Sequence, residues 1–313
     1  MSEIKKRTTI GGQALLEGIL MRGPKKTAIV VRKPDGELEV KEDSVGTGSH
    51  GAFAKLPFIR GAVNLFDSLK YGISALEYSA SFSEDGMDEL TPFEQKLYDK
   101  YGKEKMDAVM MGFALFLGIL LPIGLFFLLP TVVAGLFSGI RVGVLKNLLE
   151  GCVRICIFLG FIILTSKQKD IHRTYMYHGA EHKTIFCYEA GLPLTVENCR
   201  MQKRFHPRCG TSFLFVVVVI SILISSVVFS FVEWRNLWVR FAMHLLLLIP
   251  IVGVAYEFNR YVGGHDTPVT RFLSRPGLWL QNFTTNEPDD SMLEVAIHAI
   301  ELVIPAEKGK DKW

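Results

Sequence analysis

The chain has 313 residues, 49% of them hydrophobic, and it contains 22 phenylalanines. Its formal net charge of +3 is too small for the basic footprint of a nucleic-acid-binding protein, so nucleic acid is not expected as a partner. The hydrophobic residues are concentrated in long uncharged runs, which predicts an α-helical integral membrane protein with polar segments between its spans.

Residues 1–106 precede the first of these runs and are predicted to form an N-terminal α+β region. The segment "TAIVVRKPDGELEVKED" alternates on both sides of Asp35-Gly36, which is typical of a β-hairpin. Residues 56–80 have the spacing of an amphipathic helix. The sequence "TPFE" at residues 91–94 is a capping box, which predicts a short helix leading toward the first span.

The stretch "GGQALLEGILMRGP" at residues 11–24 has a high density of glycines. Glycine permits tight turns and lets other backbone segments approach closely. The favoured interpretation is a structural turn in which Glu17 pairs with Arg22. A contact of these two residues with a ligand is the alternative.

Long apolar stretches predict about four membrane spans, because roughly 20 apolar residues cross a bilayer as a helix. Residues 107–166 are expected to contain the first two spans. The first, Ala108–Ile140, is uncharged, and Pro122 and Pro130 are expected to kink it. The third and fourth spans are expected within residues 211–258.

The second span is the weakest prediction of the four. The stretch Val142–Ser166 is long enough to span only if it includes Lys146, Glu150 and Arg154. These residues are four apart, so they form a stripe on one face of a helix. We expect that stripe to face either the helix bundle or the lipid headgroups.

The polar segment at residues 167–210 carries eight Lys and Arg residues, and positively charged loops remain on the cytoplasmic side. With four spans, this rule places both termini in the cytoplasm as well. The protein is therefore expected to be a multi-pass protein of the cell membrane, with the bilayer as a partner. Residues 259–313 are predicted to form a cytoplasmic tail, in which Met292–Val303 has helical spacing.

His178, Glu181 and His182 form an H-x-x-E-H pattern in "YHGAEHKTIFCYE". On a helix these positions share one face, so the two imidazoles can hold one ion and the glutamate can act as general base on a bound water. This order is the inverted zincin signature. Residues 170–190 contain no proline and are followed by Gly191, which predicts a single helix.

The sequence "RFHPRCGTSF" adds His206 and Cys209, which lie three residues apart in a proline-containing turn. Both side chains are common zinc ligands. Glu189 follows His182 by seven residues, which predicts a further ligand or a hydrogen-bond partner for an imidazole. Any one of these residues alone is more typical of a solvated polar patch, but their concentration within 32 residues favours a metal site.

Four stretches together resemble a bacterial family, the YqhQ-like membrane proteins, also called domain of unknown function family 1385. The stretches are "GGQALLEGILMRGPKKTAIVVRKPDGE", "YHGAEHKTIFCYE", "RFHPRCGTSF" and "TTNEPDDSMLEVAI". The resemblance extends from about Thr9 to Ile304, and "ALLEGILMRG" differs only conservatively from the expected "AVMEGVMMRG". It implies a multi-span, metal-dependent enzyme without indicating a substrate. The metal site that it implies contains His178, Glu181, His182, His206 and Cys209.

The favoured function is a zinc-dependent, membrane-embedded hydrolase with Glu181 as general base. Zinc would be held by the two histidines of the helix and by one of His206 or Cys209, and the substrate would be lipid-linked or a membrane protein. If His206 and Cys209 both bind the zinc, all four positions of the ion are occupied and the site is closed. The alternative is then a membrane scaffold or assembly factor with a structural zinc knot. A transporter is the second alternative and ranks last, because transport sites lie near the bilayer midplane whereas this polar cluster lies in a loop. Whether the chain is an enzyme therefore depends on the number of ligands.

Overall fold

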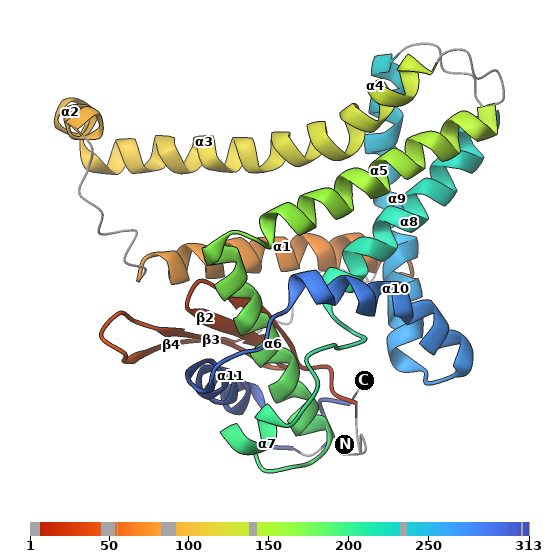
Figure 1. Ribbon diagram of the computed structural model, residues 1–313. Coiled ribbons are helices and arrows are strands. Elements are labelled where there is room, and N and C mark those ends of the chain that lie inside the picture. The colour runs from red at the N-terminus through yellow and green to blue at the C-terminus, as the bar shows by residue number, and fades with distance from the viewer. Residues whose placement is uncertain are drawn as a thin grey trace. The chain divides into compact units, whose positions relative to one another are not determined.

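The computed structural model describes most of the chain, namely residues 7–44, 54, 56–82, 92–137, 143–231, 237–307 and 309–312. These residues are mostly helical, with a four-stranded sheet near the N-terminus (Figure 1). They divide into two compact units. Unit 1 comprises Met1–Ser83, Ile162–Ile220 and Ile249–Trp313, and unit 2 comprises Glu84–Phe161 and Ser221–Leu248.

The sheet of unit 1 is antiparallel, and its strands are neighbours in chain order. The strands are β1 (Gly11–Leu15), β2 (Gly18–Arg22), β3 (Lys26–Arg32) and β4 (Leu38–Ser44). The predicted hairpin around Asp35-Gly36 is confirmed as β3 and β4, with Gly36 at a φ of 86° in the turn. The glycine-rich stretch forms a second hairpin, β1–β2, which the sequence pattern predicted only as tight turns.

Both faces of the sheet are covered, because alternate residues of β2 and β3 point to opposite sides. Ile19, Met21 and Val30 belong to the core that includes α6 (Lys169–Glu189) and α11 (Asp290–Val303). Leu20, Ile29 and Val31 belong to a second core on the other face, with Ala75 of α1 (Ile59–Ala80). Figure 1 shows α1 and α11 on opposite sides of the sheet.

The helices predicted around the metal-site pattern and in the tail are confirmed as α6 and α11. Gly191, at a φ of 65°, follows the end of α6. The N-cap of α11 is Asp289, whose carboxylate accepts the amide proton of Met292 at 3.0 Å. A short helix, α7 (Val196–Arg200), lies between α6 and the turn that carries His206.

Helix α1 is attached at its first turn to α9 (Leu237–Gly264). Arg60 donates two hydrogen bonds to the carboxylate of Glu257, at 2.6 and 2.5 Å. Beside this pair, a Cβ on Gly61 would lie 3.1 Å from the Cα of Gly253, so the two helices approach closely. Helix α9 is followed by α10 (Pro268–Thr284), whose Thr267 and Thr270 form a capping box.

Within the described residues, four helical stretches are long and apolar enough to cross a membrane. They are Ala108–Leu136, Leu145–Thr165, Gly210–Ser230 and Trp238–Gly264. The first combines α3 (Lys103–Ile123), the π-helical segment η3 (Gly124–Leu128) and α4 (Leu129–Leu136), and the others belong to α5 (Gly143–Thr165), α8 (Gly210–Phe231) and α9. The predicted span limits Ile140 and Val142 lie outside the described residues, as does Thr91 of the capping box before α2 (Pro92–Tyr101).

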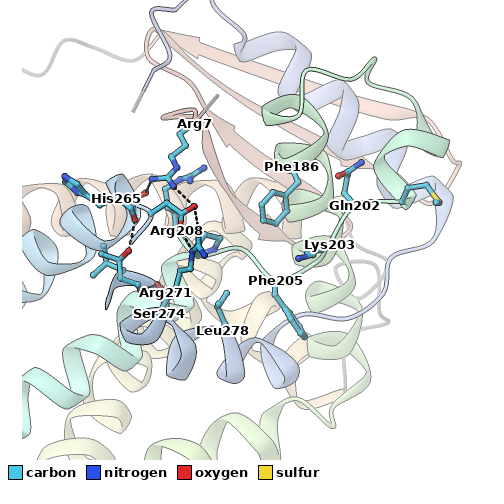
Figure 2. A pocket seen from close by; sticks show the side chains of 16 residues that line it. Arg7, Phe186, Gln202, Lys203, Phe205, Arg208, His265, Arg271, Ser274 and Leu278 are labelled. Atoms are coloured by element: carbon cyan, nitrogen blue, oxygen red, sulfur yellow. Dashed lines mark hydrogen bonds and ion pairs between the residues drawn. The ribbon is translucent and has the colours of Figure 1, made fainter. Parts of the chain in front are cut away.

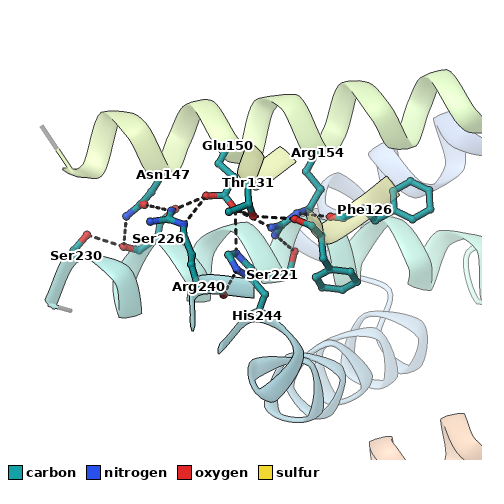
Figure 3. Close-up of polar contacts among 11 residues, drawn as sticks. Phe126, Thr131, Asn147, Glu150, Arg154, Ser221, Ser226, Ser230, Arg240 and His244 are labelled. Carbon is teal, nitrogen blue, oxygen red and sulfur yellow. Dashed lines mark hydrogen bonds and ion pairs between the residues drawn. The ribbon is translucent and has the colours of Figure 1, made fainter. Parts of the chain in front are cut away.

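In unit 2, the first candidate span continues through its prolines by way of the π-helical segment. Pro130 has no N–H to donate to the carbonyl of Phe126, four residues earlier. That carbonyl instead accepts a hydrogen bond from Nε of Arg154 at 3.1 Å (Figure 3). A charged side chain of α5 therefore satisfies a backbone group that proline leaves without its usual partner.

The predicted charged stripe of α5 faces the interior of unit 2, where Glu150 and Arg154 are each only 3% exposed. Glu150 accepts hydrogen bonds from Thr131 at 2.9 Å, from Arg154 at 3.4 Å and from Arg240 at 2.6 Å (Figure 3). His244 lies 3.2 Å from the same carboxylate. One buried carboxylate thus neutralises part of the charge of two arginines.

We expect Glu150→Ala to destabilise the protein by about 3–5 kcal/mol, because removing one member of a buried ion pair leaves the other charges uncompensated. Lys146→Ala, one turn earlier on α5, is the matched control and should cost less than 1 kcal/mol. The free energy of unfolding can be measured in mixed micelles titrated with dodecyl sulfate. Equal stability of the two variants would contradict the ionic network.

The predicted orientation of the basic segment can be tested at Met201, which is 82% exposed. In Met201→Cys, an impermeant thiol reagent should label the new cysteine only after the cells are permeabilised. The wild-type chain is the background control, because Cys187, Cys199 and Cys209 are buried and the other cysteines lie in a candidate span. Labelling in intact cells would show that the predicted topology is wrong.

Candidate metal centre

Helix α6 and the turn before α8 bring three potential ligands together in unit 1. His178 and His182 lie one helical turn apart on α6, and Cys209 immediately precedes α8. One ligand atom from each of the three residues lies within 4.8 Å of the other two. All three side chains are buried. The sequence-predicted histidine pair therefore meets Cys209 in the fold.

The main chain fixes the proton position on both imidazoles. Nδ1 of His178 lies 2.7 Å from the carbonyl oxygen of Thr284, and Nδ1 of His182 lies 2.5 Å from that of Arg204. A carbonyl oxygen only accepts, so each Nδ1 must carry the proton and donate it. Each Nε2 is thereby directed to the cluster, which is the arrangement found for metal-binding histidines.

The atoms of the cluster have few other partners. Nε2 of His182 is buried and has no hydrogen-bond partner among the described residues. Nε2 of His178 lies 3.1 Å from Sγ of Cys209. Thr211 also contacts this sulfur, through its hydroxyl at 3.1 Å and its amide at 3.4 Å. Two imidazole nitrogens and one sulfur form a donor set that suits zinc.

Cys209 and His178 stabilise each other's charged forms. Burial opposes the thiolate, but His178 and His182 hold the pKa of the Cys209 thiol well below its usual value. Burial also opposes the imidazolium, but the nearby sulfur and Glu181 raise the pKa of His178 to about 9. A thiolate is the form of cysteine that binds metals.

Glu181 lies between the two histidines and is held by the first strand. One carboxylate oxygen accepts the amide proton of Gly12 at 3.0 Å, and the other is buried without a partner among the described residues. Burial raises the pKa of Glu181 above its usual value. A Cβ at Gly12 would lie 2.5 Å from the carbonyl oxygen of Leu20 and 3.2 Å from Cδ of Glu181, so glycine is needed for this approach.

His206 lies beside the cluster without joining it. Its ring is tilted against that of His182 at 5.4 Å between centroids and meets that of Phe186 edge-on at 4.6 Å. Nε2 of His206 faces Glu189 at 3.7 Å, and burial lowers the pKa of His206 to about 4. The main chain of His206 is clamped by Gln281, which accepts its N–H and donates to its carbonyl oxygen, both at 2.8 Å.

Glu189 belongs to a neighbouring buried ion pair. Its carboxylate pairs with Arg208 and accepts the amide proton of Thr8 at 2.8 Å. Burial opposes its charge, but His206 and Arg208 hold the pKa of Glu189 below its usual value. Glu189 thus contacts an imidazole, as the sequence suggested, although this is the imidazole of His206, which lies outside the cluster.

The predicted pair between Glu17 and Arg22 is wrong. Glu17 occupies the β1–β2 turn at a φ of 50° and binds Arg173 of α6 instead. Its carboxylate also accepts a hydrogen bond from the hydroxyl of Tyr177 at 3.2 Å. Arg22 lies over the ring of Tyr71, 5.5 Å from its centroid. The two residues are at opposite ends of β2, which separates them.

Two residues that fix the cluster were not identified from the sequence. Thr284 supplies the carbonyl for His178, and Gln281 holds the turn of His206 and Cys209. Both come from the end of α10. Thr284 opens the stretch "TTNEPDDSMLEVAI", which resembles the family, whereas Gln281 lies in "WLQNF" and carried no signal.

The comparisons with known proteins identify the family of the chain. The family model described as "Protein of unknown function (DUF1385)" matches residues 56–306. The chain is also 31% identical over 305 residues to "Uncharacterized protein YqhQ" of Bacillus subtilis (strain 168), covering 96% of this chain and 93% of the relative. The chain therefore belongs to this family of unknown function. No solved structure matches it.

The geometry predicts which substitutions remove a bound metal. We expect the purified wild type to contain zinc and His178→Ala, His182→Ala and Cys209→Ser each to lose most of it, because each variant removes one of the three potential ligands. His206→Ala should keep it. Elemental analysis of the detergent-purified proteins measures the zinc content, and gel filtration confirms that each variant is folded. Full zinc in His178→Ala, or its loss in a folded His206→Ala, would contradict this ligand set.

Proposed function

We propose that the chain is a zinc-dependent hydrolase of the cell membrane, with its active site on the cytoplasmic face. The observation that carries the proposal is the ligand set. His178, His182 and Cys209 converge, while His206 is held outside the cluster. Three protein ligands leave the fourth position of zinc open for a water molecule, which is typical of catalytic sites rather than structural ones.

Each residue of the cluster would have a separate role in the reaction. His178, His182 and Cys209 would hold the ion, which when bound supplies a Lewis acid that lowers the pKa of a water molecule. Glu181 would act as general base, because its unpartnered oxygen is free to accept a proton. Its raised pKa favours that role near neutral pH. The Gly12 amide would keep the carboxylate in place.

The position of the cluster supports a membrane-associated substrate. Cys209 immediately precedes Gly210, where the third candidate span begins. A substrate that is lipid-linked or part of a membrane protein would reach this depth without leaving the bilayer. The same position argues against the transporter, whose site belongs near the midplane of a span.

The structural zinc knot remains the second candidate, and burial favours it. His182 is 1% exposed and Glu181 is 5% exposed, so both lie away from solvent. In a structural zinc site, the unpartnered oxygen of Glu181 would be the fourth ligand and would close the site. The two proposals thus assign different roles to the same carboxylate.

Glu181→Gln separates the two roles, because the amide keeps the shape of the side chain and removes its basicity. We expect this variant to fold and to keep its zinc, yet to fail to complement a deletion strain. Loss of a positioned base lowers the rate by roughly 10²–10⁴-fold. Glu197→Gln, at an exposed acidic position of the same polar segment, is the control and should complement fully.

Two results would contradict the proposed hydrolase function. Full complementation by a well-expressed Glu181→Gln variant would show that no base is needed at this position. Loss of zinc from that variant, with the fold intact, would identify Glu181 as a fourth ligand and support the structural knot.

A further inference from the structure

A cavity of about 370 Å³ lies beside the cluster in unit 1 (Figure 2). Its walls come from the turn before α8, the end of α9 and the first turns of α10, together with Arg7 and with Phe186 of α6. The cavity does not include the three potential ligands. Its size is that of a small-molecule site.

The cavity has a surplus of positive charge. Four cationic side chains line it, which are those of Arg7, Lys203, Arg208 and Arg271. Asp266 pairs with Arg7 and Arg271, and the buried Glu189 pairs with Arg208. Two positive charges are therefore left unmatched. Lys203 is exposed, and its ammonium group has no hydrogen bond or ion pair within the described part of the chain.

The cavity also has apolar lining. Phe186, Phe205 and Leu278 contribute to it, and Figure 2 shows the two phenylalanine rings across from Arg7 and Arg208, with Lys203 between them. A cavity lined only by cationic side chains would suit a free anion. The presence of both surfaces suits an amphiphile, whose charged head and hydrocarbon portion need different neighbours.

The surrounding helices place the cavity at the level of lipid headgroups. Val262 and Gly263 line it, and they are among the last residues of the candidate span Trp238–Gly264. Helix α10 follows directly, and it exposes Val269 and Phe272 beside Arg271. A helix with apolar and basic side chains at its surface is typical of the membrane interface.

The cavity and the cluster share their dividing wall. Phe186 lines the cavity and contacts the ring of His206, which in turn contacts the ring of His182. Arg208 also lines the cavity and is the neighbour of Cys209 in the chain. On this side, a ligand in the cavity is therefore separated from the cluster by the rings of Phe186 and His206.

We infer that this cavity binds a phosphate group carried by a membrane amphiphile. Arginine and lysine side chains recognise phosphate through charge-assisted hydrogen bonds, and the apolar lining accommodates the adjoining hydrocarbon. The identification of this amphiphile as the substrate rests on the proposed function, whereas its binding does not require the metal. The cavity would hold the headgroup at the bilayer surface, beside Phe186 and Arg208.

The test uses the full-length protein in a zwitterionic detergent and three water-soluble probes. These probes are dihexanoyl phosphatidic acid, inorganic phosphate and dihexanoylglycerol, with affinity measured by titration calorimetry. Phosphatidic acid should bind at least tenfold more tightly than either other probe. Lys203→Gln should weaken its binding by about tenfold, the usual effect of losing one charge-assisted hydrogen bond, and Lys203→Arg should restore it.

Arg275→Gln is the matched control, because Arg275 is an exposed cation of α10 outside the cavity. It should leave the affinity unchanged. Equal affinity for dihexanoylglycerol, or wild-type affinity in Lys203→Gln, would overturn the inference. Equal affinity for inorganic phosphate would overturn the assignment to an amphiphile. Binding measured in Glu181→Gln and in zinc-depleted protein separates the two proposals, since phosphatidic acid should bind both normally even if the hydrolase is wrong.

Discussion

The candidate centre depends on two hydrogen bonds from imidazole to main chain. Nδ1 of His178 donates to Thr284 and Nδ1 of His182 donates to Arg204, so three segments of the chain must meet before both rings are fixed. The bonds set the tautomers, turn both Nε2 atoms toward Cys209 and place the end of α10 against α6. Gln281 extends the same constraint to the turn that carries the sulfur. The sheet and α11 support α6 from its other side, and the close approach at Gly12 brings the first strand to Glu181.

Much of the fold followed from the sequence because strong periodic signals determine it. The uncharged stretches gave the candidate spans, the spacing after Asp289 gave α11, and the Asp-Gly turn gave the β3–β4 hairpin. The β1–β2 hairpin was missed, because its strands are short and glycine weakens their alternation. Its glycines were nevertheless interpreted correctly as sites of close approach. The partner of Glu17 was also missed, since Arg173 is 156 residues away and no local pattern links them.

The candidate site was only partly predictable for the same reason. His178, Glu181 and His182 share one helical face, so local geometry alone brings them together. Whether His206 or Cys209 lies beside the two histidines of α6 depends on the position of a short turn. Gln281, 75 residues after His206, fixes that turn. Glu189 was predicted as a ligand or as the partner of an imidazole; it faces His206, and Arg208 gives it an ion pair outside the cluster. Tertiary contacts thus decide which potential ligands converge, and sequence spacing supplies only the candidates.

The way in which α11 closes the sheet has a consequence for biosynthesis. Ile19, Met21 and Val30 emerge early from the ribosome, but the helix that covers them is made only after residue 290. Even the carboxylate that accepts a hydrogen bond from the hydroxyl of Thr8 belongs to Asp311. During nearly all of translation, this apolar face of the sheet therefore lacks the helix that covers it, because all four candidate spans are made before α11. Such long-range closure is slow and exposes a surface that is prone to aggregation. A chain that ended before Asp290 would keep that face of the sheet without α11.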